Sequence, residues 1–212
     1  MQNITSQIMA SRIVAIVRLE NYDSAVEVAR ALALGGITTI EFTLTGSGAN
    51  EAISACRAAL GDTMLVGVGT VLDEHAANAA IMAGAQFVVT PALRPKVIKA
   101  CGAQNIPVLC GAFTPTEALT AHELGAQMVK IFPARALGAA YIRDLLAPLP
   151  FLKLVPTGGI GPENARSYLD AGAAAVGMGG NLVAARAVAA GDWEAITTAA
   201  RACVKAVEPR PS

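Results

Sequence analysis

Short apolar runs recur along the whole chain, and a longer, alanine-rich stretch with interspersed polar residues follows each of them. Short runs rich in β-branched side chains are typical of strands buried on both faces, and the longer stretches are typical of helices. The pattern therefore predicts strands at Ile13–Val17, Thr38–Leu44, Met64–Val71, Gln86–Thr90, Pro107–Phe113, Gln127–Phe132, Leu152–Pro156 and Ala174–Met178.

Residues that begin helices stand between these runs. Thr114 and Glu117 have the spacing of a capping box, in which each side chain accepts a hydrogen bond from the other residue's backbone N–H. Ser24 and Glu27 have the same spacing. We therefore expect helices to begin directly after Ser24 and after Thr114.

The alternation of strands and helices predicts the α/β fold class. Eight such units in roughly 200 residues fit the lower size limit of the (β/α)8 TIM barrel. No linker-like stretch divides the sequence, so we expect a single barrel domain over residues 1–212, with a short N-terminal helix before the first strand. The alternative is a doubly wound sheet, whose nucleotide-binding form has a G-x-G-x-x-G turn where this chain has Arg18, Leu19 and Glu20.

Composition narrows the class of protein. The chain has 16 basic and 16 acidic residues, is 54% apolar, and is only 15% charged, against about 25% in an average soluble domain. These values exclude an intrinsically disordered chain and predict no nucleic-acid partner. No apolar stretch has the length of a bilayer span and no signal-peptide pattern is visible, so we expect no membrane partner and a cytoplasmic location. We expect four buried, reduced cysteines: Cys56, Cys101, Cys110 and Cys203.

Lys130 is the most informative single residue. It lies at the C-terminal end of an apolar strand that has no other charge, and such ends supply the catalytic groups of barrels of this class. Lysines are seldom buried, and burial lowers the pKa of an amine, so that more of it is neutral and able to attack a ketone. The alternative is a structural lysine whose ammonium pairs with a carboxylate.

Two further charges fall at predicted strand ends. Glu41 interrupts the second strand, and we expect it to act as a general acid/base or to neutralise Lys130 or Arg18 in an ion pair. Arg18 follows the first strand, and we expect it to hold a substrate carboxylate through two hydrogen bonds or to be an ordinary exposed arginine.

Glycine pairs after the last two strands predict a phosphate site. They lie at residues 158–159 and 179–180, in the two loops that bind phosphate in such barrels, where glycine lets backbone N–H groups approach the ligand. Tight turns alone are the alternative. His75 and His122 have no partner at ligand spacing, so the sequence predicts no metal site.

Four segments carry a resemblance to a known family: residues 40–43, 67–72, 129–134 and 156–159. Together, in this order and at these spacings, the four segments resemble those of the class I pyruvate aldolases that cleave 2-keto-3-deoxy-6-phosphogluconate (KDPG). That family includes the 4-hydroxy-2-oxoglutarate (KHG) aldolases and the related 2-keto-3-deoxy-6-phosphogalactonate (KDPGal) aldolases. The resemblance implies a homotrimer that binds a phosphorylated keto-deoxy sugar acid and pyruvate. It implies no cofactor, because the chemistry runs through a covalent imine on Lys130.

The resemblance also implies roles for individual residues. The Schiff-base lysine falls on Lys130 and the general acid/base on Glu41. The threonine that contacts the pyruvate moiety falls on Thr70, and a proline beside the site falls on Pro91. The remaining positions expected to bind substrate are Arg18, Thr45, Phe132, Thr157, Gly158, Gly159, Gly179, Gly180 and Asn181.

Two positions depart from the family pattern. Thr45 stands where many gluconate-type members have arginine, so we expect Arg18 to take over the substrate carboxylate, as the matching arginine does in galactonate-type relatives. Asn181 stands where many members have serine, and we expect it to cap the following helix and donate to the phosphate.

We therefore expect reversible cleavage of KDPG to pyruvate and glyceraldehyde 3-phosphate. KDPGal and unphosphorylated 4-hydroxy-2-oxoglutarate, which would yield pyruvate and glyoxylate, are the other candidate substrates. Two alternatives come from other classes. One is a phosphate-binding isomerase or epimerase with Glu41 as base and Lys130 as electrostatic stabiliser, and the other is a barrel that binds sugar phosphates without catalysis.

Overall fold

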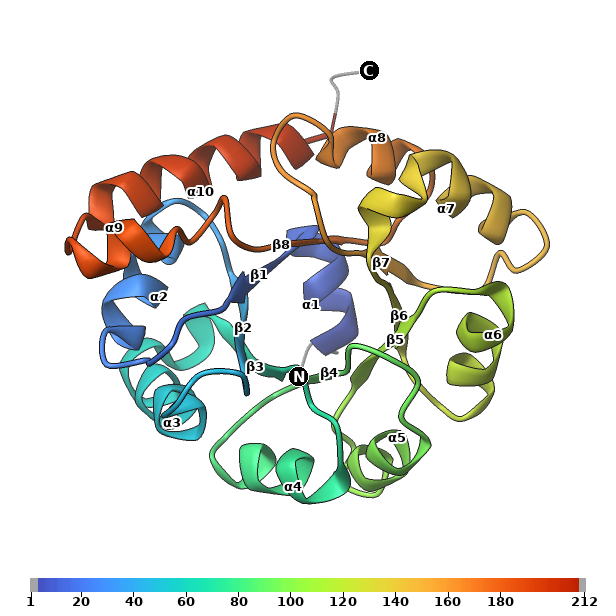
Figure 1. Ribbon diagram of the computed structural model, residues 1–212, viewed down its shortest axis with the longest axis horizontal. Helices are drawn as coiled ribbons and strands as arrows, with labels where there is room; N and C mark the ends of the chain where they lie inside the picture. Colours follow the sequence, from blue (N-terminus) through green and yellow to red (C-terminus); the bar gives the residue numbers. More distant parts are fainter. Residues whose placement is uncertain (1–3, 210–212) are drawn as a thin grey trace.

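The strands form a barrel that is surrounded by helices (Figure 1). The computed structural model describes residues 4–209, in which every strand pair is parallel and the order is β7-β6-β5-β4-β3-β2-β1-β8. A single bridge between Thr157 and Gly177 joins the last two strands in the chain and closes the barrel. The strands are β1 Ile13–Val17, β2 Thr39–Thr43, β3 Leu65–Gly69, β4 Val88–Val89, β5 Val108–Ala112, β6 Met128–Ile131, β7 Leu154–Pro156 and β8 Val176–Met178.

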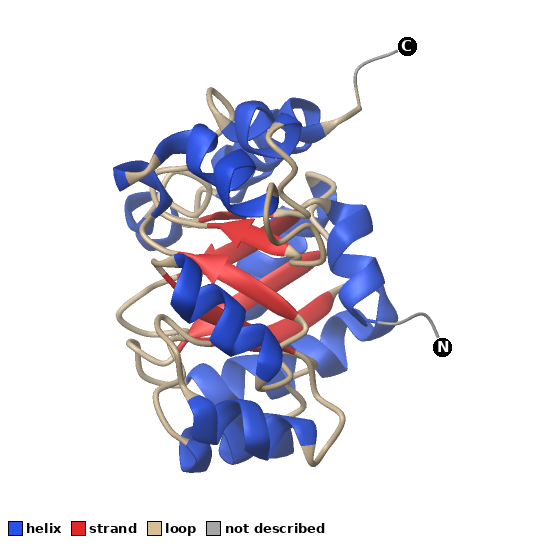
Figure 2. Ribbon diagram, turned by 90° about the vertical axis from the view of Figure 1, so that its right-hand side faces the viewer, coloured by secondary structure: helices blue, strands red, loops and turns tan. Residues whose placement is uncertain are grey.

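Helices alternate with these strands and lie on the outside of the barrel, as the side view in Figure 2 shows. The (β/α)8 architecture predicted from the sequence is therefore confirmed, including the short helix before β1. The helices are α1 Ile4–Ser11, α2 Ala25–Leu34, α3 Ala49–Leu60, α4 Glu74–Met82, α5 Pro95–Gly102, α6 Pro115–Glu123, α7 Gly138–Leu146, α8 Ala165–Asp170, α9 Ala185–Ala189 and α10 Trp193–Val207, with 3₁₀ turns η1 Gly61–Thr63 and η2 Ala134–Ala136. None of the helices within residues 4–209 has the length and apolarity needed to cross a membrane.

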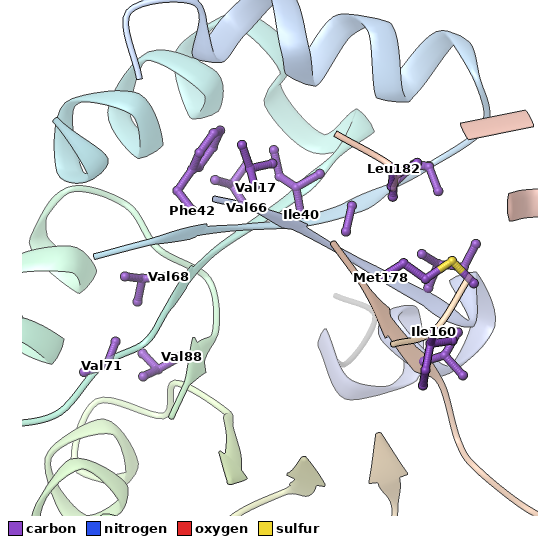
Figure 3. Close-up of a cluster of buried hydrophobic side chains, with 14 of the residues drawn as sticks. Val17, Ile40, Phe42, Val66, Val68, Val71, Val88, Ile160, Met178 and Leu182 are labelled. Carbon is purple, nitrogen blue, oxygen red and sulfur yellow. The ribbon is translucent and has the colours of Figure 1, made fainter. Parts of the chain in front are cut away.

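Side chains of each strand point alternately outward, toward the helices, and inward, into the barrel. Val17, Ile40 and Phe42 belong to the outward cluster, which Figure 3 shows against the helices. The inward side chains form a separate apolar cluster around Leu109, and Ile8 of α1 is part of it. Helix α1 thus covers the N-terminal end of the barrel (Figure 1), and the strand ends that carry the candidate residues lie at the opposite end.

Both predicted helix starts are confirmed, but only one of them has the expected capping box. The Glu117 N–H donates to Thr114 Oγ1 at 3.3 Å and the Thr114 N–H donates to Glu117 Oε2 at 2.8 Å, which is the expected capping box before α6. Ser24 precedes α2 but makes no side-chain capping bond. Its backbone, at φ −103° and ψ 26°, lies outside the extended region that capping by a side chain requires.

Strand β4 is shorter than its apolar run predicts. The Thr90 N–H still donates to the Leu109 carbonyl, at 3.1 Å, but the Gly111 N–H donates to the side-chain Oγ1 of Thr90, at 3.0 Å. Thr90 Oγ1 in turn donates to the Ala92 carbonyl at 2.8 Å. The threonine side chain therefore replaces the next ladder hydrogen bond, and the chain turns at Pro91.

Candidate active site

Lys130 and Glu41 face each other inside the barrel. Their strands, β6 and β2, are four positions apart in the strand order, so that inward side chains from them meet across the interior. Lys130 Nζ lies 3.9 Å from Glu41 Oε1. Lys130 is 4% exposed and Glu41 is 1% exposed, and they are the buried charged residues among residues 4–209.

Glycines on neighbouring strands leave the space that this arrangement needs. A Cβ on Gly69 of β3 would lie 2.6 Å from Glu41 Oε1. Gly111 of β5 pairs directly with Lys130 in the sheet register, and a Cβ there would lie 2.3 Å from the carbonyl carbon of Pro91. A larger residue at either position would displace the glutamate or the backbone at Pro91.

The surroundings of Glu41 favour a carboxyl group that exchanges protons. Burial raises the pKa of Glu41 above its usual value, and the nearby charges of Lys130 and Arg18 offset part of that rise. Glu41 Oε1 has no hydrogen-bond partner among the described residues. A buried carboxyl with a raised pKa and a free oxygen suits a general acid/base.

A cavity of about 390 Å³ opens beside Lys130 at the C-terminal end of the barrel. Among residues 4–209, its charged lining residues are Arg18, Lys130 and Arg135, and no acidic side chain lines it. The lining therefore favours an anionic ligand. A larger cavity of about 700 Å³ lies between α1 and α10 at the other end, and neither Lys130 nor Glu41 reaches it.

The predicted phosphate loops border this cavity. Gly158 and Gly159 adopt left-handed backbones, with φ of +98° and +73°, which favour glycine over other residues. The backbone N–H groups of Gly159, Gly180 and Asn181 donate to no acceptor within residues 4–209, and all three residues line the cavity. Free backbone N–H groups beside a cavity are the donors that bind phosphate oxygens.

The structure brings most of the predicted site residues to this cavity. Phe132 lies against the ammonium of Lys130, which is 5.3 Å from the ring centroid. The cavity lining includes these predicted residues: Arg18, Lys130, Phe132, Thr157, Gly158, Gly159, Gly179, Gly180 and Asn181.

Other predicted residues lie at strand ends but do not line the cavity. Thr70, directly after β3, has a left-handed backbone with φ of +60°, a strained conformation for threonine. Pro91 follows β4 beside Gly111. Thr45 is exposed, and its hydroxyl shares a 2.8 Å hydrogen bond with that of Thr43.

One expected role is wrong. Helix α9 begins at Ala185 with Ala184 before it, so Asn181 caps no helix. It lies instead in the turn after Gly180, in which the Leu182 N–H donates to the Gly179 carbonyl at 2.7 Å. The polar residue stays at the cavity because this turn, rather than a helix, follows β8.

Sequence reasoning missed Arg135, which lines the cavity from η2. An arginine in a loop after a strand carries no signal in the sequence, because most such residues are solvated. The histidines lie elsewhere: His75 is exposed, and His122 contacts Phe151, with ring centroids 4.9 Å apart and the rings tilted by 42°. Within residues 4–209, no group of three or more His, Cys, Asp or Glu side chains could hold a metal ion.

Comparison with known proteins identifies the family. A family model described as KDPG and KHG aldolase matches residues 4–199. This chain belongs to the KDPG and KHG aldolase family. It is therefore an aldolase, a lyase of a family that acts on keto-deoxy sugar acids.

Relatives in this aldolase family cover most of the chain. The 2-dehydro-3-deoxy-phosphogluconate aldolase of Treponema pallidum is 40% identical over 188 residues, which are 88% of this chain and 89% of that protein. The 2-dehydro-3-deoxy-6-phosphogalactonate aldolase of Escherichia coli is 37% identical over 171 residues, which are 80% of this chain and 83% of that protein. The two relatives differ in the substrate that their names give.

Solved structures of the family have the same fold. A KDPG aldolase from Legionella pneumophila, with pyruvate captured as a covalent carbinolamine intermediate, aligns with a TM-score of 0.88. It is 27% identical, and the alignment covers 96% of this chain and 99% of that chain. A native KDPGal structure aligns with a TM-score of 0.86 at 36% identity, over 92% of this chain and 93% of that chain.

Proposed function

We propose that this aldolase reversibly cleaves KDPG to pyruvate and glyceraldehyde 3-phosphate through an imine on Lys130. The observation that carries the proposal is the buried Lys130–Glu41 pair, with 3.9 Å between Nζ and Oε1, beside a cavity whose charged lining is entirely basic. The carbinolamine in the Legionella pneumophila relative belongs to the same class of chemistry.

The chemistry begins when the neutral amine of Lys130 attacks the C2 ketone of the substrate. The carbinolamine that forms loses water and becomes an iminium ion. Glu41 then takes the proton of the C4 hydroxyl, and the electrons of the C3–C4 bond move toward the iminium nitrogen. Glyceraldehyde 3-phosphate leaves, and the remaining pyruvate enamine takes a proton at C3 before water releases pyruvate and restores the amine.

Glu41 is the proposed acid/base because, among residues 4–209, it is the carboxylate that pairs with Lys130. Its raised pKa lets it hold a proton for return to the enamine. Burial also keeps bulk water away from the reacting carbon, which strengthens the electrostatic effect of both charges.

The remaining contacts orient the substrate. We assign the substrate carboxylate to Arg18, which lines the cavity and whose guanidinium has no hydrogen-bond acceptor among the described residues. The free N–H groups of Gly159, Gly180 and Asn181 are assigned to the phosphate. Thr70 is assigned to the pyruvate moiety, because it directly follows β3, at the end of the barrel where Lys130 lies. Binding of the remote phosphate supplies energy that positions the ketone for attack.

KDPGal is the second candidate substrate, and one observation favours it. Thr45 is engaged with Thr43 at 2.8 Å, which leaves Arg18 as the cation at the β1–β2 side of the cavity. That is the arrangement expected of galactonate-type members. The 37% identity to the phosphogalactonate aldolase of Escherichia coli is consistent with this choice.

Two measurements test the proposed function. Pyruvate release from KDPG, KDPGal and 4-hydroxy-2-oxoglutarate, followed in parallel, identifies the substrate. Borohydride reduction in the presence of pyruvate should attach a three-carbon adduct to Lys130, detected by peptide mass spectrometry. A folded chain that remains unlabelled would contradict the imine. Lys130→Arg keeps the charge, so residual turnover by this variant would instead support the isomerase or epimerase alternative.

We also propose that the whole chain acts as one catalytic domain and assembles as a homotrimer. A chain of a cage designed by fusing symmetric oligomeric domains aligns with a TM-score of 0.86 at 36% identity. Large apolar side chains are exposed on the isolated chain, among them Met82 at 88% and Leu34 at 73%. Light scattering after size exclusion should give three times the mass of one chain.

A cytoplasmic location is the remaining proposal. Four free cysteines are buried, and burial raises the pKa of Cys56 to about 12 and that of Cys101 to about 11. Such thiols stay protonated and unpaired, as is usual in a reducing compartment. Cell fractionation tests this location.

A further inference from the structure

We propose that Arg135 binds the phosphate group of the substrate and makes the enzyme selective for phosphorylated substrates. Arg135 is not one of the two residues of the proposed catalytic pair, Lys130 and Glu41, and the sequence did not predict it as a site residue. The proposal rests on the proposed function, because it assigns a residue and a selectivity to the same cavity.

The backbone of Arg135 is attached to the first phosphate loop. Its N–H donates to the Gly158 carbonyl at 3.0 Å, and the N–H of the preceding Ala134 donates to the Thr157 carbonyl at 2.8 Å. Tyr168 holds the same turn from α8, because its hydroxyl donates to the Ala134 carbonyl at 3.3 Å. These bonds fix where the Arg135 side chain starts relative to the loop.

The side chain of Arg135 lies against Gly159. A Cβ added to Gly159 would lie 2.7 Å from Arg135 Cβ and 3.1 Å from its Cδ. Only a residue without a side chain lets the arginine stem pass this close. The guanidinium is therefore carried over the same loop whose free N–H group, at Gly159, borders the cavity.

The Arg135 guanidinium is free. Within residues 4–209 the arginine side chains that donate hydrogen bonds or form ion pairs are those of Arg12, Arg57, Arg166 and Arg201, and Arg135 is not among them. Two surface arginines in this part of the chain have carboxylate partners: Arg166 Nη2 lies 2.7 Å from Asp170 Oδ1, and Arg201 Nη1 lies 3.6 Å from Glu194 Oε1.

Charge around the cavity points to an anion. Arg135, Arg18 and Lys130 line it together, and none of its lining residues in the described part of the chain is acidic. Like charges around one cavity repel each other, and a bound anion relieves that repulsion. A guanidinium presents two parallel N–H donors that match two oxygens of a phosphate.

The position of Arg135 decides whether it binds the phosphate or the carboxylate of the substrate. Arg18 follows β1, whereas Arg135 lies over the β7 loop with the free N–H of Gly159. The N–H groups of Gly180 and Asn181, after β8, border the same cavity. A phosphate at this side would accept hydrogen bonds from these three backbone N–H groups and from the Arg135 guanidinium, while the carboxylate of the same substrate meets Arg18.

The test compares the unaltered chain with Arg135→Gln, which keeps the stem and removes the charge. We expect kcat/KM for the phosphorylated substrate to fall about 10- to 100-fold, mainly through KM, because a hydrogen bond to a charged group is lost. Exchange of pyruvate methyl protons in D₂O uses Lys130 and Glu41 without a phosphate, and we expect it to change less than twofold. Inorganic phosphate should inhibit cleavage by the unaltered chain at lower concentration than it inhibits Arg135→Gln.

Two further variants complete the experiment. Arg143→Gln removes an exposed arginine from α7 that does not line the cavity, and it should leave both reactions unchanged. Arg135→Lys keeps the charge without the fork and should recover part of the loss. An Arg135→Gln chain with unchanged KM for the phosphorylated substrate, or with equal losses in cleavage and in exchange, overturns the proposal.

The two proposals fail differently. If the unaltered chain neither exchanges pyruvate protons nor forms the borohydride adduct on Lys130, the proposed function fails. If exchange and labelling are intact and only the phosphate-dependent difference is missing, the role of Arg135 fails and the proposed function stands.

Discussion

Lys130 Nζ and Glu41 Oε1 are 3.9 Å apart, a distance that permits an ion pair but exceeds a hydrogen bond. Both side chains are buried, so their charges interact in a medium of low dielectric and with little screening by water. Because Glu41 Oε1 has no hydrogen-bond partner among the described residues, it stays able to accept a proton from a substrate. The geometry therefore places an amine close to a proton acceptor without a hydrogen bond between them.

Glu41→Gln should separate proton transfer from binding. The amide keeps the size of the side chain but cannot take a proton, so we expect kcat to fall about 10²- to 10⁴-fold with a small change in KM. Steady-state cleavage gives both constants. The borohydride adduct on Lys130 should still form, but more slowly. A raised KM with an unchanged kcat would show instead that Glu41 acts chiefly by binding substrate.

The same variant should reveal the raised pKa of Glu41 through stability. Because the folded-state pKa is above the ordinary value, the native chain binds more protons than the unfolded chain between these two values, and stability falls as pH rises through that range. The loss is about 1.4 kcal/mol for each pH unit in the range and is complete above the folded pKa. Glu41→Gln lacks this loss.

Urea unfolding of both chains between pH 4 and pH 8 measures the effect. The free energy of unfolding of Glu41→Gln minus that of the unaltered chain should be smallest at about pH 4 and should increase with pH. A difference that decreases with pH would mean that the charge of Lys130 outweighs the burial of Glu41.

Gly111→Ala should impair the site through the backbone. The new Cβ would lie 2.3 Å from the carbonyl carbon of Pro91, and backbone cannot rotate away as a side chain can. We expect a loss of about 1–3 kcal/mol in stability and a lower kcat, because Gly111 pairs with Lys130. Thermal unfolding and steady-state kinetics check both effects.

Gly102→Ala is the matched control for that substitution. A Cβ on Gly102, at the end of α5, would have no atom within 4 Å, so it should leave activity and stability nearly unchanged. Equal effects of the two substitutions would remove the close approach at Pro91 as the cause.

Thr90→Val should loosen the turn at Pro91. Valine keeps the shape but leaves the Gly111 N–H and the Ala92 carbonyl without the bonds of 3.0 Å and 2.8 Å that the hydroxyl makes. We expect about 1–3 kcal/mol of lost stability by thermal unfolding. Thr90→Ser keeps the hydroxyl, so it should retain most of the stability that Thr90→Val loses. An equal loss in both variants would show that the methyl group, and not the hydroxyl, stabilises the turn.

The sequence by itself determined the barrel and its most important charges. Parallel strands covered by helices must be apolar on both faces, so they appear as continuous runs, and Lys130 and Glu41 stand out because they interrupt such runs. The need for glycine in a loop was also predictable where it is local, as at Gly158 and Gly159, whose backbones are left-handed. The capping box at Thr114 could be predicted for the same reason, whereas the one expected at Ser24 could not.

Only the tertiary structure decided which of these residues meet. Thr45 and Thr70 stand at strand ends, as the pattern predicts, yet they do not line the cavity, and Arg135 lines it without any signal in the sequence. The need for glycine at Gly69 and Gly111 likewise depends on partners from other strands. Periodicity tells which face of its own strand a side chain occupies. The neighbours of that side chain are determined by the closure of the barrel, which brings together residues from distant parts of the chain.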